Sequence, residues 1–132
     1  FPNKSFSVLD FNIPDFLKNK KNIRYFEGDI KSNLINISDN KYEFVICTHV
    51  IEHIEDPDMI LKNLRRICSK YLLIICPIEK KFKWGINHHV NFFQDHLSFL
   101  KFVNKFINHN EDIRRDFYYI SNLGDILYFE SY

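Results

Sequence analysis

The sequence predicts an α/β fold with a mostly parallel sheet that ends in an antiparallel hairpin. Short apolar runs alternate with segments of helical periodicity, which is the pattern of β-α-β units. The run YLLIIC at Tyr71–Cys76 is continuously apolar, as expected for a strand covered on both faces. Near the end of the chain, Ile113 to Ile120 and Asp125 to Tyr132 flank the turn sequence SNLG, which is a hairpin signal.

The first part of the chain predicts two strands joined by a short helix. The sequence KSFSVLDF at Lys4–Phe11 is rich in strand-forming residues and closes on an acid. A proline at the first helical turn opens a short helix, Pro14 to Lys20. A second strand, NIRYF at Asn22–Phe26, ends in the turn Glu27–Asp29. The polar stretch Lys31–Asn40 is predicted to be a loop.

The middle of the chain predicts a strand followed by an amphipathic helix. Lys41–Thr48 is the third predicted strand, and Pro57 with Asp58 begins a helix. Apolar residues recur there at helical spacing: Met59, Ile60, Leu64 and Ile67. The charged residues between them are expected to face water: Lys62, Arg65 and Arg66.

The strand at Tyr71–Cys76 is stopped by Pro77 and followed by a polar loop, Glu79–Asn91. A second amphipathic helix is predicted over Gln94–Phe106. Its expected apolar face consists of Leu97, Leu100, Val103 and Phe106. The predicted elements therefore alternate along the chain and end in the hairpin, as a mostly parallel sheet requires.

The size and charge of the chain limit its class. Its 132 residues are enough for one domain over 1–132. Hydrophobic residues make up 45% and aromatic residues 17%, which is ample material for a packed core. The net charge is +1 and the lysines are scattered, whereas nucleic-acid-binding proteins usually have a concentrated basic face. The composition therefore argues against a nucleic-acid partner.

The cysteines and the apolar runs indicate a cellular setting. Cys47, Cys68 and Cys76 are odd in number and have no C-x-x-C spacing. This predicts reduced, buried thiols in a cytoplasmic protein, not a disulfide scaffold or a zinc knuckle. No apolar run reaches the about 18 residues that a membrane helix needs, so we expect no membrane partner.

The most informative stretch is YEFVICTHVIEHIEDP, at Tyr42–Pro57. It opens as an apolar strand, turns polar at Thr48 and His49, and continues through Glu52 and His53 to an acidic turn. Ligands of open α/β sheets bind beyond the carboxyl ends of the strands. A buried strand that ends in ionisable groups therefore predicts a functional site.

This stretch resembles the fourth strand and following loop of the class I S-adenosylmethionine-dependent methyltransferases, of the type 11/23-like group. The family pattern, FD-V-x-x-x-x-V-x-EH-x-x-DP, has matches at Phe44, Val45, Val50, Glu52, His53, Asp56 and Pro57, with Glu43 in place of the usual Asp. The resemblance implies a Rossmann-like sheet, S-adenosylmethionine as cofactor, and methyl transfer to a small-molecule or sugar acceptor.

One part of the family pattern is missing. In the family, a first strand ends in a glycine-rich loop that lets the backbone approach the cofactor. The only glycines here are Gly28, Gly85 and Gly124, and no G-x-G occurs. Val8 to Asp10 therefore matches the family's second strand. We expect an N-terminally incomplete domain, a homodimer that exchanges elements, or a reduced sheet, and no catalysis if the loop is truly absent.

The resemblance also implies cofactor-binding residues. Asp10 corresponds to the acid that bonds the ribose hydroxyls, although it could equally cap the following helix. Asp29 corresponds to the acid that bonds the adenine amino group, and Ile30 packs on the ring. A lone Gly-Asp pair is also an ordinary tight turn. Thr48 and His49 correspond to residues that contact the methionine part of the cofactor.

The catalytic residues implied are His53, Glu52 and His89. Methyl transfer depends mostly on in-line positioning, with a base where the nucleophile must lose a proton. A histidine can accept that proton near neutral pH, although His53 could instead orient the loop. His88 and His89 follow the strand that ends at Pro77, so the sheet's polarity brings them to the same edge as His53. Either one could act on the acceptor.

Two rival interpretations concern metal. His49, Glu52 and His53 form an H-x-x-E-H sequence, the inverted zinc-protease signature, with Glu130 as a distant third ligand. That motif must lie on a helix, whereas this one leaves a strand, so we assign no metal ligands. The stretch also loosely resembles the metal-assisted 2′-O-methyltransferases of small RNAs, which hold a divalent ion with E-x-x-E-H and a later histidine.

A last alternative is a methyltransferase-like domain that binds or scaffolds without catalysis. The missing glycine-rich loop is the feature that favours it. Binding of S-adenosylmethionine distinguishes the enzyme from the scaffold.

Overall fold

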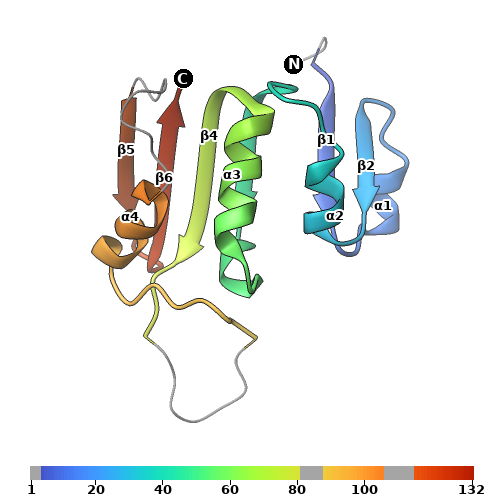
Figure 1. Ribbon diagram of the computed structural model, residues 1–132. Coiled ribbons are helices and arrows are strands. Elements are labelled where there is room, and N and C mark those ends of the chain that lie inside the picture. Colours follow the sequence, from blue (N-terminus) through green and yellow to red (C-terminus); the bar gives the residue numbers. More distant parts are fainter. Residues whose placement is uncertain (1–3, 81–87, 106–114) are drawn as a thin grey trace. The chain divides into compact units, whose positions relative to one another are not determined.

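The computed structural model describes residues 4–80, 88–105 and 115–132. The chain divides into two compact units, Phe1–Ile37 and Ser38–Tyr132, which are considered separately (Figure 1). A single domain over 1–132 stays a prediction. None of the helices among the described residues has the length and apolar character needed to cross a membrane.

The first unit is built on two parallel strands. Strand β1 (Phe6–Asp10) pairs with β2 (Ile23–Glu27) so that Asp10 lies opposite Glu27. The short helix α1 (Asp15–Lys18) connects them, and Pro14 is its N-cap residue. Both strands and the connecting helix confirm the elements predicted from the sequence.

The predicted loop at Lys31–Asn40 is wrong, because it begins with a helix, α2 (Ile30–Ile35). The Asp29 carboxylate accepts a hydrogen bond from the Ser32 amide at 3.1 Å, which satisfies an N–H that the first turn leaves unpaired. Leu34 is buried and anchors the helix in the unit. A cap and one buried leucine therefore outweigh the polar composition of the segment.

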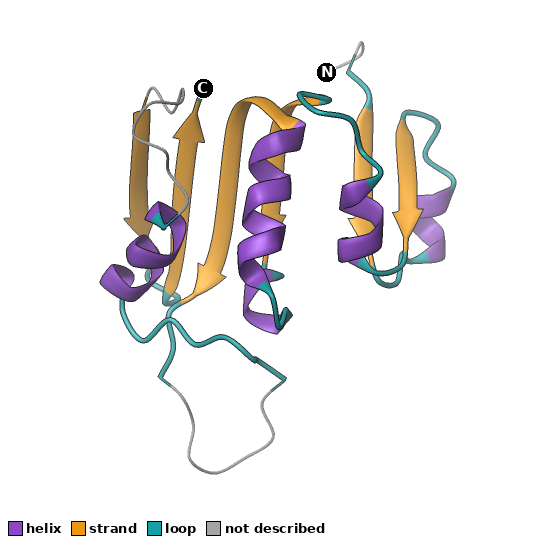
Figure 2. Cartoon of the chain, in the orientation of Figure 1, coloured by secondary structure: helices purple, strands orange, loops and turns teal. Residues whose placement is uncertain are grey.

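The described residues of the second unit form a four-stranded mixed sheet (Figure 2). The strand order is β3-β4-β6-β5, with strands as follows: β3 (Tyr42–Thr48), β4 (Cys68–Pro77), β5 (Arg115–Ile120) and β6 (Asp125–Ser131). β3 and β4 are parallel, and β6 is antiparallel to both of its neighbours. The predicted α/β fold with a C-terminal antiparallel hairpin is confirmed.

Three helical segments lie in the described part of this unit: the 3-10 turn η1 (Ile51–His53), α3 (Pro57–Ile67) and α4 (His96–Asn104). Asp56 caps α3 by accepting from the Met59 amide at 3.2 Å, and Pro57 occupies the first helical turn. The Asp-Pro pair of the sequence motif is therefore the start signal of a helix.

Helix α4 differs from its predicted form. Asp95 and Ser98 make a capping box, which starts the helix at His96. The predicted apolar residue Leu97 is 57% exposed, whereas Phe99 is buried. Phe99 and Val103 are the buried residues of this helix. The predicted helix end at Phe106 and strand start at Ile113 lie outside the described residues.

Helices α3 and α4 lie on the same face of the sheet (Figure 1). Strand residues on that face are buried: Val45, Cys47, Leu72, Ile74, Cys76, Ile126, Tyr128 and Glu130. Phe99 of α4 packs edge-on against Tyr128 of β6, with ring centroids 6.1 Å apart. This face contains the core of the second unit.

The opposite face of the sheet carries a row of aromatic rings, the aromatic row: Phe44, Tyr71, Phe129 and Phe117. Neighbouring rings in the row lie 6.3, 5.7 and 4.9 Å apart, one from each strand. Phe117 is 60% exposed and Phe44 is 51% exposed. The prediction that β4 is covered on both faces is therefore wrong, because in the described part of the chain both helices of this unit lie on one face.

A buried ion pair joins α3 to β6 and α4. The Arg65 guanidinium binds the Glu130 carboxylate and donates to the Val103 carbonyl oxygen at 2.8 Å. The Tyr132 hydroxyl donates to Glu130 at 2.6 Å. Arg65 was predicted to face water, and this is wrong because Glu130 is fully buried beneath the helix and needs a counter-charge. Glu130 is thus held by Arg65, and not by a metal as in the protease interpretation.

Replacing Arg65 with alanine is expected to destabilise the protein by about 3–5 kcal/mol, since it leaves a buried carboxylate unpaired. The matched control is Arg66→Ala, on the same helix. Its partner Asp39 is 71% exposed, and an exposed ion pair contributes about 0–1 kcal/mol. Urea unfolding followed by circular dichroism measures both variants. Equal losses would show that the Arg65–Glu130 pair contributes nothing beyond a surface pair.

Candidate active site

The candidate site forms where β3 and β4 end. After Thr48 the chain turns at His49, whose φ of 50° lies in the left-handed region, which histidine enters more readily than most residues. The His49 amide still donates to the Ile75 carbonyl oxygen at 2.9 Å. The strand pairing therefore extends to the turn, and it delivers η1 directly to the carboxyl edge of the sheet.

Glu52 lies at the centre of the site, and its side chain is only 1% exposed. The Cys76 thiol lies 3.6 Å from its Oε2 atom and donates to it. The Oε1 atom is 3.3 Å from His49 Nδ1 and 3.9 Å from His53 Nε2. Even so, Oε1 accepts no hydrogen bond within the described part of the chain. A buried carboxylate oxygen without a donor is uncommon in folded proteins.

His53 faces Glu52 with one defined ring nitrogen. Its Nδ1 lies 3.3 Å from the carbonyl oxygen of His88. A carbonyl only accepts hydrogen bonds, so Nδ1 carries the hydrogen. In the neutral ring the Nε2 atom then holds a lone pair, and this lone pair is turned toward Glu52. The side chain is 42% exposed, so it lies at the boundary between the core and solvent.

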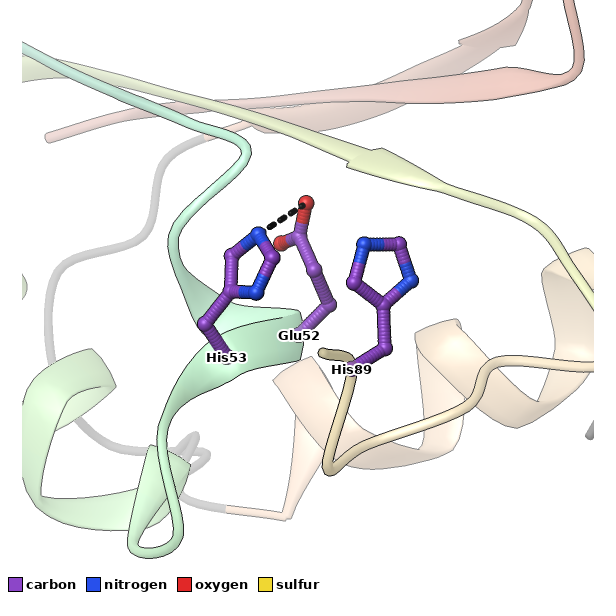
Figure 3. A group of neighbouring side chains, drawn as sticks. All are labelled: Glu52, His53 and His89. Atoms are coloured by element: carbon purple, nitrogen blue, oxygen red, sulfur yellow. Dashed lines mark ion pairs between the residues drawn. The ribbon is translucent and has the colours of Figure 1, made fainter. Parts of the chain in front are cut away.

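His89 closes the other side of the site. Its ring centroid is 4.6 Å from that of His53, at 75°. Its Nδ1 atom pairs with the Glu79 carboxylate. Figure 3 shows the Glu52 carboxylate between the two imidazoles, with the other nitrogen of His89 turned toward it.

Backbone hydrogen bonds fix the His89 segment against η1. The amides of Val90 and Asn91 donate to the Glu52 carbonyl oxygen at 2.7 and 3.0 Å. The Asn91 side chain donates to the carbonyl oxygens of Ile51 and Ile54 at 3.0 and 2.5 Å. These hydrogen bonds hold the His89 segment against η1, although the two are far apart in sequence. They therefore help to fix the distance between the imidazoles of His53 and His89.

Burial and the Glu52 charge keep the nearby thiols protonated. Desolvation, and then the charge of Glu52, raises the pKa of Cys47 to about 12. The same two causes raise the pKa of Cys76 further. All three cysteines are free and buried, which confirms the prediction of buried, unpaired thiols. The thiol next to Glu52 therefore acts as a hydrogen-bond donor.

The first unit holds the predicted nucleoside residues. Asp10 ends β1, and its carbonyl oxygen accepts from the Gly28 amide at 3.0 Å. Its carboxylate accepts from the Asn12 amide at 3.3 Å and is exposed. Pro14 is the N-cap residue of α1, so Asp10 does not cap that helix. Gly28 has a φ of 126°, a conformation that favours glycine.

Asp29 and Ile30 begin α2 on the same edge of this unit. Hydrogen bonds from Ser32, mainly from its amide, lower the pKa of Asp29. Asp29 is exposed, so it caps the helix and still presents a charged side chain to solvent. Asp10 and Asp29 thus occupy the carboxyl ends of adjacent parallel strands.

The structure brings together four of the predicted site residues: His49, Glu52, His53 and His89. Thr48 is exposed at the end of β3, and the His88 side chain is exposed while its carbonyl supports His53. Sequence reasoning missed Glu79 and Cys76 as partners of the site. Glu79 comes two residues after Pro77, where β4 ends. An acid at the carboxyl end of a strand could have indicated that Glu79 belongs to the site.

Comparison with known proteins finds one matching family model and one shared fold. Residues 12–74 match the family model described as a methyltransferase domain. A S-adenosylmethionine-dependent methyltransferase from Aquifex aeolicus shares the fold with a TM-score of 0.62 at 14% identity, over 96% of this chain and 68% of that one. One from Archaeoglobus fulgidus has a TM-score of 0.61 at 15% identity, over 96% and 75%. No curated protein matches the chain. The predicted family resemblance is confirmed.

The raised pKa values predict thiols that do not react in the folded protein at pH 8. Cys47, with a pKa near 12, has almost no thiolate at that pH, and only the thiolate is nucleophilic. We expect negligible reaction with Ellman's reagent until guanidinium is added, and then release from all three cysteines. Raising the pH toward 10 without unfolding should change little. Fast reaction of the native protein at pH 8 would contradict this burial.

Proposed function

From the fold of the class I S-adenosylmethionine-dependent methyltransferases and the methyltransferase-domain match over residues 12–74, we propose that this chain transfers a methyl group from S-adenosylmethionine to a small-molecule or sugar acceptor. The observation that carries the proposal is the convergence of Glu52, His53 and His89 beyond the parallel strands β3 and β4. Sheets of this type place their ligands at that edge.

The nucleoside is assigned to the first unit. Asp10 presents an exposed carboxylate at the end of β1, where ribose hydroxyls can donate to it. Asp29 is kept ionised by its Ser32 hydrogen bonds, and it is assigned to the adenine amino group. Ile30, the next residue, supplies an apolar surface for the ring. Thr48 and His49 are assigned to the methionine moiety.

The acceptor is assigned to the histidines. His53 donates through Nδ1 to the His88 carbonyl, so Nε2 is the nitrogen that takes up a proton. Glu52 lies 3.9 Å from that nitrogen and stabilises the imidazolium that forms. A base oriented by one group and charge-balanced by another is the usual arrangement for activating a hydroxyl or amine. His89 completes the wall of the site on the other side.

A domain that binds S-adenosylmethionine without transferring its methyl group differs from this proposal only in its acceptor chemistry. The buried Glu52 beside two imidazoles favours the enzyme, since such a charge has no packing benefit. The experiments below separate the two functions by measuring binding and turnover independently.

Asp10→Asn should weaken S-adenosylmethionine binding at least about tenfold, because hydrogen bonds to a charged acceptor contribute about 1.5–3 kcal/mol. Isothermal titration of the full-length protein measures the dissociation constant. The matched control is Asp15→Asn, another exposed acid of the same unit, which should leave the affinity within about twofold by the same reasoning. Absence of any heat with the unmodified protein would overturn the cofactor assignment.

His53→Ala should lower methyl transfer by about 10²–10⁴-fold, the usual contribution of a general base, while S-adenosylmethionine affinity changes little. Release of S-adenosylhomocysteine is followed with a panel of hydroxyl- and amine-bearing small molecules and sugars. His96→Ala, at the start of α4 and stacked on Tyr118, is the control and should keep full turnover. Parallel loss of affinity and turnover in His53→Ala would remove the base role.

A further inference from the structure

We propose that Glu52, His53 and His89 form a binding site for one divalent transition-metal ion. One ligand atom from each of the three residues lies within 4.8 Å of the other two. Glu52 is 1% exposed, and its Oε1 atom has no hydrogen-bond donor in the described part of the chain. The buried Glu52 carboxylate lies between the imidazoles of His53 and His89, and a cation at this place would be coordinated by all three side chains (Figure 3).

The spacing of the three ligand atoms is close to that of an occupied site. Ligand atoms at about 2.0–2.1 Å from a tetrahedral ion lie about 3.4 Å from one another. The present separations, up to 4.8 Å, require the side chains to close by at most about 1.4 Å, which rotation of an imidazole or a carboxylate provides. The backbone needs no change, because the Asn91 hydrogen bonds already hold the two segments together.

The surroundings of both histidines are those of metal ligands. A metal-bound histidine usually donates its other ring N–H to a carbonyl or a carboxylate, which fixes the ring and its tautomer. His53 donates through Nδ1 to the His88 carbonyl. His89 pairs through Nδ1 with the Glu79 carboxylate. In both histidines Nε2 is thereby directed toward Glu52. The His88 carbonyl and the Glu79 carboxylate are the groups that would hold the two metal-binding rings in place.

The number of groups that need a partner favours a dication over a proton. A proton binds a single nitrogen. A divalent ion can be coordinated at once by the imidazoles of His53 and His89 and by the Glu52 carboxylate, and its charge is attracted by that buried carboxylate.

The ligand set selects the kind of metal. Two histidines and one glutamate are the protein ligands of several catalytic zinc sites, which keep a further position for water or substrate. Imidazole favours zinc and its first-row neighbours over magnesium and calcium. His49 Nδ1, 3.3 Å from the same carboxylate oxygen, borders the site, and its half-exposed side chain leaves a path to solvent.

Metal binding is tested directly on the full-length protein, purified without a nickel column and stripped with EDTA. Titration with zinc chloride alone, followed by calorimetry and by plasma mass spectrometry after dialysis, should show one ion per chain. Cobalt(II) should give the intense visible bands of a four- or five-coordinate ion. His89→Ala and His53→Ala should each weaken zinc binding by more than about 100-fold, since loss of an outer partner alone costs about 10–100-fold.

Two further variants separate a built site from loose surface binding. Glu79→Gln removes the partner of His89 and should weaken zinc about 10–100-fold. His88→Ala is the matched control, because its side chain is exposed while its backbone carbonyl remains. It should bind zinc as the unmodified protein does. Circular dichroism verifies that each variant is folded.

The proposal is overturned if the unmodified protein retains no stoichiometric ion, or if His88→Ala loses as much affinity as His89→Ala. The His53 Nε2 lone pair binds either the ion or the acceptor proton, so the proposed base role of His53 belongs to the metal-free protein and its turnover is measured after EDTA treatment. The zinc titrations contain no S-adenosylmethionine. A failure of the metal site therefore leaves the proposed methyl transfer intact, and a protein that does not bind S-adenosylmethionine can still bind zinc.

Discussion

Removing a carboxylate from water is the constraint that organises the second unit. An ionised carboxylate buried without a partner costs several kcal/mol, and the described residues of this unit include two buried carboxylates, Glu52 and Glu130. Each is fully enclosed on the helix-covered side of the sheet. Arg65 of α3 contacts Glu130, and the imidazoles of His53 and His89 lie beside Glu52.

The two carboxylates are compensated in opposite ways. Glu130 receives a guanidinium from Arg65 and a hydroxyl from Tyr132, so its charge is balanced by the chain itself. Glu52 receives one thiol, and its other oxygen faces two imidazoles without a hydrogen bond in the described residues. The Arg65–Glu130 arrangement stabilises the core. The Glu52 carboxylate can still attract a cation or a proton donor, which is a property of a binding or catalytic site and not of a scaffold.

Local patterns in the sequence were sufficient for the strands and for most of the helices. The alternation of apolar runs and the Asp-Pro helix start at Asp56 carry their information within a few residues, so they could be read directly. The loop motif likewise located Glu52 and His53. The site histidine His89 followed from the polarity of the sheet, because parallel strands place their carboxyl ends together.

What failed depends on contacts between distant residues. Arg65 looked like a solvent-facing charge until Glu130, 65 positions away, was placed beneath it. Helix α2 was hidden because one cap and one buried leucine decide it, and neither gives a periodic signal. The pairing of His89 with Glu79 and the orphan oxygen of Glu52 are matters of orientation, which no spacing in the sequence encodes.

The aromatic row bears on the tendency of this protein to self-associate in solution. Four aromatic rings, one edge-on contact and two stacked ones, run across a sheet in which β3 pairs only with β4 among the described residues. Water-facing rings beside an open strand edge are the combination that promotes self-association. Phe44 is 51% exposed. It belongs to the aromatic row and lies on β3, the strand whose second edge is unpaired among the described residues. Self-association at this face is therefore expected to limit the concentration at which the chain remains monodisperse.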